Sequence, residues 1–223
     1  MALAAASLLA CSLELFRELR YGGPEFRFLL WNLFLAWLPL LLALFVYDRY
    51  RGGSPLVFLT PWVALWLLFL PNAPYTVTDF VHLEAGHGTP LWLDGMILSA
   101  FGWTGLLLGF VSIYLVHAVA RHRFGARVSW ASVAVVIALV SVGVWLGRLL
   151  RWNSWDLLVR PGQRLGELST RLADPDALLR GTILTLVMTV LLGTSYLVFY
   201  ALFGSRFVPE RRLPAVRRPL RPR

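Results

Sequence analysis

The chain consists largely of apolar runs that are too long for the core of a soluble domain. Five of them meet or approach the roughly 20 residues that a helix needs to cross a ~30 Å hydrocarbon layer. These runs are residues 26–47, 52–70, 91–120, 128–147 and 181–203. They are longer than β-strands and show no period-two alternation, which excludes an outer-membrane barrel. The sequence therefore predicts an all-α, polytopic transmembrane helical bundle.

A sixth apolar run, residues 1–16, is shorter and ends near Glu14, so its crossing is left open. Counting it, we expect about six spans. Between the fifth and sixth, leucines at 165, 168 and 172 alternate with charged residues, which predicts a helix lying in the membrane interface. Residues 1–205 are then a single transmembrane helical domain, and residues 206–223 a basic, disordered cytoplasmic tail.

The charges are few and positive: 15% of residues are charged, against roughly a quarter in soluble proteins, and the net charge is +9. Every basic residue is an arginine, placed at the end of an apolar run or in the tail. This pattern indicates the lipid bilayer as the partner rather than a nucleic acid, which needs a basic face on a soluble module. Cytoplasmic termini put twelve arginines on that side and nine opposite, a small excess that favours this orientation.

Two polar segments are predicted to meet at one membrane face. Residues 71–90 follow the third run and residues 148–176 follow the fifth, so two crossings separate them. Pro71 and Pro74 stop the third helix and leave backbone carbonyls that need other donors, which Asn72 and Thr78 can supply. We expect residues 71–90 to be a connection, whose face is outside the cytoplasm in the favoured orientation.

Polar groups at this face are candidates for a site, because such groups are costly in a membrane unless they are paired or wet. We expect Asp79 or Asp156 to pair with Arg148 or Arg151. Asp79 is also the candidate catalytic acid or base. The binding candidates are Asn32, Asn72, Tyr75, Thr78, Asp79, Asp94, Arg148, Arg151, Asn153 and Asp156. The opposite half of the bundle offers almost nothing comparable, and His117 and His122 there are expected to mark a helix end.

The role of this cluster stays open. It either locks two segments together and satisfies broken helix ends, or uses Arg148 and Arg151 to bind an anionic lipid headgroup or lipid-linked substrate. A structural or assembly partner of another membrane protein is an alternative function, and that partner is unknown. A transporter component is a second alternative, disfavoured because the polar groups collect at one face and no internal repeat is evident.

Metal and cofactor chemistry find little support. His82, Glu84 and His87 beside Asp79 are possible ligands, but their spacing matches no helical two-ligand motif, so we expect a solvated loop and no metal site. The chain has no Walker loop, dinucleotide fingerprint, G-x-S-x-G or H-E-x-x-H motif. We expect no cofactor, and enzyme activity is left open.

Small residues recur one turn apart at Gly105 and Gly109 and again at Gly143 and Gly147. This spacing lets helix backbones approach closely. It is typical either of dimerisation or of packing within one chain, and we expect the latter.

Three motifs carry a family resemblance. They are Trp31-Asn32-Leu33, then Leu70-Pro71-Asn72-Ala73-Pro74-Tyr75 with Thr78-Asp79, then Gly147-Arg148 with Arg151-Trp152-Asn153-Ser154-Trp155-Asp156. Over residues 27–203 the chain resembles a family of small bacterial multi-pass membrane proteins catalogued as a domain of unknown function. The resemblance implies a multi-pass protein of the bacterial inner (cell) membrane, and brings no established substrate or reaction.

Overall fold

The structure is a computed structural model that describes residues 1–83, 88–149 and 174–207, with the single positions 159, 162 and 166. Every element in these ranges is a helix, so the predicted all-α bundle is confirmed. The elements are α1 (Ala2–Tyr21), α2 (Arg27–Arg51), α3 (Leu56–Phe69), α4 (Asn72–Tyr75), the 3₁₀ helix η1 (Thr76–His82), α5 (Leu91–Phe124), α6 (Ala126–Leu149) and α9 (Pro175–Phe207).

Five stretches of the described chain are long and apolar enough to cross a membrane, which fits a multi-pass membrane protein. They are Arg27–Arg51, Leu56–His82, Leu91–Phe124, Ala126–Arg148 and Pro175–Gly204. Helix α1 is not among them, because Glu14, Arg17 and Glu18 interrupt its apolar run. The expected interfacial helix and the basic tail fall mostly on residues 150–173 and 208–223, outside the described part of the chain.

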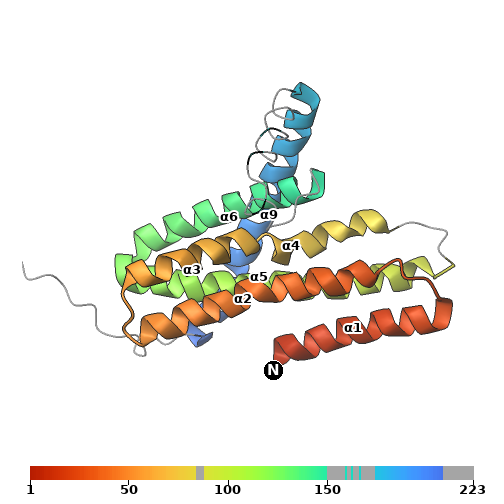
Figure 1. Cartoon of the computed structure of the whole chain (residues 1–223), viewed down its shortest axis with the longest axis horizontal. Coiled ribbons are helices and arrows are strands. Elements are labelled where there is room, and N and C mark those ends of the chain that lie inside the picture. Colours follow the sequence, from red (N-terminus) through yellow and green to blue (C-terminus); the bar gives the residue numbers. More distant parts are fainter. Residues whose placement is uncertain (84–87, 150–158, 160–161, 163–165, 167–173, 208–223) are drawn as a thin grey trace, which may run out of the picture.

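The helices α1, α2, α3, α5 and α6 run along the long axis of the molecule, whereas α9 crosses them at a steep angle (Figure 1). Helix α5 is the centre, in contact with α1, α2, α6, η1 and α9. Gly125 has φ 85° and lets α5 turn directly back into α6. Helix α6 therefore ends near the end of the bundle at which α5 begins. Helix α2 also begins there (Figure 1), and we call this the Asp79 end.

Helix α9 begins with a carboxylate cap. The Asp174 carboxylate accepts hydrogen bonds from the amides of Asp176 at 3.1 Å and Ala177 at 3.4 Å, and Pro175 occupies the first helical position. Farther along, the buried Tyr196 joins α9 to the core.

The broken third span continues as helical turns instead of a loop. After α3 ends at Phe69, α4 and η1 carry the chain to His82, so the expectation of a connection from residue 71 was wrong up to that point. Side chains supply the donors that the prolines lack. Asn72 Nδ2 donates to the Phe69 carbonyl at 2.8 Å, and Thr78 Oγ1 donates to the Tyr75 carbonyl at 2.7 Å.

Glycines on α5 and α6 make room for this broken segment. A Cβ atom at Gly105 would overlap the Thr76 hydroxyl and lie 2.5 Å from the Ala73 carbonyl oxygen. A Cβ atom at Gly143 would lie 2.8 Å from Pro71 Cβ. The small-residue motifs therefore pack within the chain, as expected, and seat the break between α5 and α6.

A buried hydrogen-bonded chain also joins three helices at mid-bundle. Trp66 Nε1 on α3 donates to Ser112 Oγ on α5 at 2.6 Å, and Ser112 Oγ donates to the Pro39 carbonyl on α2 at 3.1 Å. In a medium without water, the Ser112 hydroxyl thus satisfies an indole N–H that has few other options.

We predict that Gly105→Ala destabilises the protein by about 1–3 kcal/mol, because the added methyl group forces Thr76 and the Ala73 backbone away from α5. This loss is measured as the change in the free energy of unfolding when a mild detergent is titrated with a denaturing one. Gly95→Ala, on the same helix and in open space, is the matched control and is expected to be neutral or slightly stabilising. Equal stability of the Gly105 variant and the wild type would contradict the packing.

Removing the Ser112 hydroxyl is expected to cost about 1–3 kcal/mol, since it leaves the buried Trp66 N–H without an acceptor. Thermal unfolding of Ser112→Ala in detergent tests this. Ser99→Ala, which removes an exposed hydroxyl bonded only to the carbonyl of Gly95 one turn back, serves as control and should leave the midpoint unchanged. A similar midpoint for both variants would rule out the interhelical role.

Candidate functional site

An ion pair between Asp79 on η1 and Arg148 on α6 lies at the Asp79 end of the bundle. Arg148 Nη1 is 3.3 Å from Asp79 Oδ1 and donates to the Tyr75 hydroxyl, also at 3.3 Å. Arg148 Nη2 donates to the Thr78 carbonyl. Asn32 Nδ2 on α2 donates to Asp79 Oδ2 at 3.0 Å. The expected contact between residues 71–90 and the end of the fifth apolar run is therefore present, and it runs through Asp79 and Arg148.

The sequence builds this arrangement from local features of each element. Arg148 stands in the last turn of α6, where a cation interacts favourably with the helix dipole. Its guanidinium carbon lies 5.4 Å from the centre of the Tyr75 ring, within the range of a cation–π contact. The break after α3 brings the Thr78 carbonyl to face α6. Asn32 reaches the same carboxylate from one turn inside α2.

The two partners of the ion pair differ in exposure. The Asp79 side chain is 1% exposed, whereas that of Arg148 is 16% exposed. Separating such a buried pair by removing one partner typically costs about 3–5 kcal/mol, because the remaining charge is left uncompensated. In this site the carboxylate is therefore buried, and the guanidinium lies nearer to the protein surface.

The other predicted site residues are placed differently. Asn72 donates to the Phe69 carbonyl and so satisfies the backbone at the break. Asp94 lies at the same end but pairs with Arg17. Arg151, Asn153 and Asp156 lie outside the described residues.

Of the possible metal ligands, His82 packs its ring 5.0 Å from that of Phe28. Glu84 and His87 fall outside the described residues. In the ranges that the structure does describe, no group of three or more His, Cys, Asp or Glu side chains is arranged to hold a metal ion.

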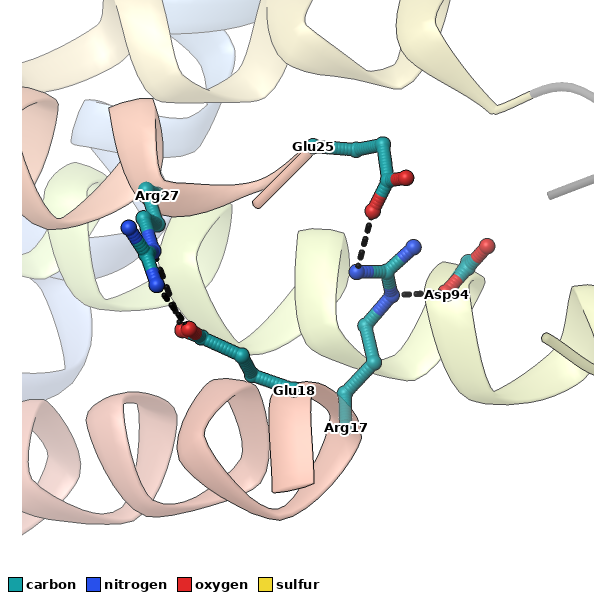
Figure 2. Close-up of polar contacts among 5 residues, drawn as sticks. All are labelled: Arg17, Glu18, Glu25, Arg27 and Asp94. Carbon is teal, nitrogen blue, oxygen red and sulfur yellow. Dashed lines mark hydrogen bonds and ion pairs between the residues drawn. The ribbon is translucent and has the colours of Figure 1, made fainter. Parts of the chain in front are cut away.

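A second charged cluster, centred on Arg17, was not predicted. Arg17 Nε donates to Asp94 Oδ1 at 2.8 Å, and Arg17 Nη1 donates to Glu25 Oε2 at 3.1 Å (Figure 2). The Phe26 ring lies 4.5 Å from its guanidinium carbon. Arg17, Asp94 and the nearby Glu14 are almost completely buried. We call these side chains, Glu14, Arg17, Glu25 and Asp94, the Arg17 cluster.

Two glycines after α1 make the Arg17 cluster possible. Gly22 and Gly23 have φ values of 75° and 85°, and a Cβ atom at Gly23 would overlap the Glu25 carboxylate. The positive φ values turn the chain back so that Glu25 reaches Arg17. One signal in the sequence pointed to part of the cluster, although not to Asp94: Glu14 and Arg17 stand three residues apart, and therefore on one helix face, within an otherwise apolar run.

An exposed pair lies beside the Arg17 cluster. Arg27 on α2 hydrogen-bonds Glu18 on α1, as Figure 2 shows, and the Arg27 side chain is 62% exposed. This hydrogen bond holds the pKa of Glu18 below its usual value. Exposed pairs of this kind contribute little to stability. Arg27 and Glu18 therefore serve as comparators for the buried groups.

The opposite end of the bundle is more polar than expected. His117 is buried, its Nδ1 is 3.0 Å from the Tyr196 hydroxyl, and its ring centre lies 4.7 Å from that of Trp130. Arg121 hydrogen-bonds the hydroxyl of Tyr200. His122 lies in the last turn of α5, as expected, but His117 lies inside the helix, so the expectation for it was wrong. Aromatic residues of α9, remote in sequence, pack against the His117 ring.

The chain matches the model of a protein family over residues 31–197. This match includes Asn32, Asp79 and Arg148 and excludes Arg17 and Glu14. No curated protein and no solved structure matches the chain. Because the matched residues make up more than half of its length, the chain belongs to the family described as "Protein of unknown function (DUF1361)".

Proposed function

We propose that this membrane protein binds the anionic headgroup of a lipid, or of a lipid-linked substrate, at Arg148. The main observation in support of this proposal is the unequal exposure of the two side chains in the ion pair, 16% for Arg148 and 1% for Asp79. An anion that approaches the site meets the guanidinium before it meets the carboxylate. Guanidinium groups also suit phosphate and carboxylate, because their planar N–H donors can form paired, charge-assisted hydrogen bonds.

Asp79 acts in this proposal as the group that orients Arg148. Its two oxygens are engaged by Arg148 and Asn32. The Tyr75 ring and the Thr78 carbonyl hold the guanidinium from other sides. A cation fixed in this way loses little side-chain freedom on binding, which favours affinity.

The position of the site in the bundle also supports a headgroup as the ligand. Arg148 stands at the end of a candidate span, Ala126–Arg148. The end of a span is where a side chain can reach the headgroup region. We further propose that the protein resides in the bacterial inner membrane, with this end outside the cytoplasm, in keeping with the arginine distribution.

We predict that Arg148→Gln weakens binding of an anionic phospholipid roughly tenfold or more, which corresponds to the loss of a charge-assisted hydrogen bond of about 1.5–3 kcal/mol. Native mass spectrometry of the gently solubilised protein, titrated with phosphatidylglycerol or with phosphatidylcholine, measures this binding. Arg27→Gln, which removes an equal charge at the same end, is the matched control and should bind as the wild type does.

Asp79→Asn separates binding from mere structural locking. It removes the negative charge that competes with the headgroup, while the asparagine oxygen can still accept a hydrogen bond from Arg148 and hold the guanidinium in place. Phosphatidylglycerol binding should therefore be kept or strengthened. Wild-type binding by a folded Arg148→Gln variant would contradict the proposal. An equal loss in Arg148→Gln and Arg27→Gln would also contradict it, because the effect would then reflect net charge alone.

A further inference from the structure

Glu14 on α1 is a buried carboxyl group that lacks a hydrogen-bond partner in the ranges that the structure describes. Glu14 is 1% exposed, and neither of its carboxylate oxygens has a hydrogen-bond partner among the described residues. The same holds for one nitrogen of its neighbour, Arg17 Nη2. Buried polar groups in native proteins nearly always have hydrogen-bond partners, so these unsatisfied atoms need an explanation.

The charge of the Arg17 cluster supplies that explanation. Three carboxyl groups, those of Glu14, Glu25 and Asp94, surround the one guanidinium of Arg17. Two of them, on Glu25 and Asp94, already engage it. A third ionised carboxylate, buried and without a donor, would carry a large desolvation cost. The usual response of a carboxyl group in such surroundings is to bind a proton.

A metal ion fits this cluster less well than a proton does. The described residues contain no His, Cys, Asp and Glu group arranged to hold a metal. The geometry of the cluster also places Arg17 between the carboxylates, where its charge would repel a metal ion. A single proton, in contrast, needs one oxygen and no further ligands.

We propose that Glu14 is a proton-binding site in which the proton competes with the guanidinium of Arg17. In the protonated state Arg17 serves Asp94 and Glu25. When the O–H bond of Glu14 breaks, the proton passes to water and the carboxylate becomes an acceptor for the unused Nη2 of Arg17. Glu14 and Arg17 are three residues apart on one helix, so their side chains are neighbours on the same face.

The surroundings of Glu14 set the pH range of this exchange. The charged groups around it are Arg17 and Glu18 on α1, Glu25 on the connection, Arg27 on α2 and Asp94 on α5. Burial raises the pKa of Glu14 to about 7, while the charge of Arg17 acts in the opposite direction. Because the native pKa exceeds that of the unfolded chain, the native state binds more protons between about pH 4.5 and 7. Its stability therefore falls as the pH rises through that window.

The exchange would couple pH to the packing of α1 on α5. Asp94 belongs to α5, and its ion pair with Arg17 is the charged link between the two helices. An ionised Glu14 takes part of the guanidinium away from that link. The Arg17 cluster shares no residue with the hydrogen-bonded site around Arg148, so this inference is independent of headgroup binding there.

Infrared difference spectroscopy of the full-length protein tests the site directly. We expect the carbonyl band of a protonated carboxylic acid that decreases between pH 5 and 9 with a midpoint near 7. Glu14→Gln, which mimics the protonated form, should remove this component of the titration. Glu18→Gln, one turn along the same helix, should leave it unchanged, since Glu18 is paired with Arg27. Persistence of the titrating band in Glu14→Gln would overturn the proposal.

A second variant tests the competition with Arg17 and does not depend on the folding of Glu14→Gln. Asp94→Asn removes a nearby negative charge and releases Arg17 toward Glu14, and both effects favour the ionised carboxylate. We expect the midpoint to move down by roughly one pH unit, a tenfold change in proton affinity. An unchanged midpoint would overturn the proposal, as would a wild-type Glu14 that is ionised, or protonated, across the whole range from pH 5 to 9.

Discussion

A broken helix inside a membrane must satisfy its backbone within the protein, because lipid offers no hydrogen bonds. In this chain the break after α3 meets that requirement in two ways. Short polar side chains such as Asn72 and Thr78 bond the carbonyls nearest to them. Arg148 reaches across from α6 to the Thr78 carbonyl and carries the ion pair with Asp79. The same arginine therefore satisfies the broken backbone and forms the charged site.

Close packing is the condition for this arrangement. Gly105 and Gly143 let the segment around Ala73 sit against the backbones of α5 and α6. That approach brings η1 within reach of Arg148 at the end of α6. A side chain at either glycine would push the segment outward and lengthen each polar contact that depends on it. Helix packing thus determines the geometry of the candidate site.

Arg17 and Arg148 lie at the same end of the bundle but have different surroundings; Arg17 is buried, whereas Arg148 is partly exposed. Arg148 faces one carboxylate, a hydroxyl and a carbonyl, so its cluster is balanced in charge. Arg17 is surrounded by three carboxyl groups, and its Nη2 has no hydrogen-bond partner within the described part of the chain. The first arrangement suits a fixed cation that can receive an anion. The second suits a carboxyl group, Glu14, that gains and loses a proton.

The sequence predicted the features that depend on local order. Long apolar runs indicated the helices, two crossings brought Asp79 and Arg148 to one end, and glycine spacing indicated close packing. Contacts that join distant elements were missed. The pairing of Arg17 with Asp94 requires α1 to lie on α5, and the burial of His117 requires aromatic residues of α9. Apolar periodicity carries no information on which helices are neighbours, so neither contact could be deduced.

The coupling between Asp79 and Arg148 is the quantity on which this account depends most. A double-mutant cycle with Asp79→Asn, Arg148→Gln and the combined variant measures it as a free energy of unfolding in detergent. We expect the double variant to lose less stability than the sum of the losses in the two single variants. The difference, which is the coupling energy, should be about 1–3 kcal/mol. Additivity of the two substitutions within about 0.5 kcal/mol would show that the ion pair does not hold η1 to α6.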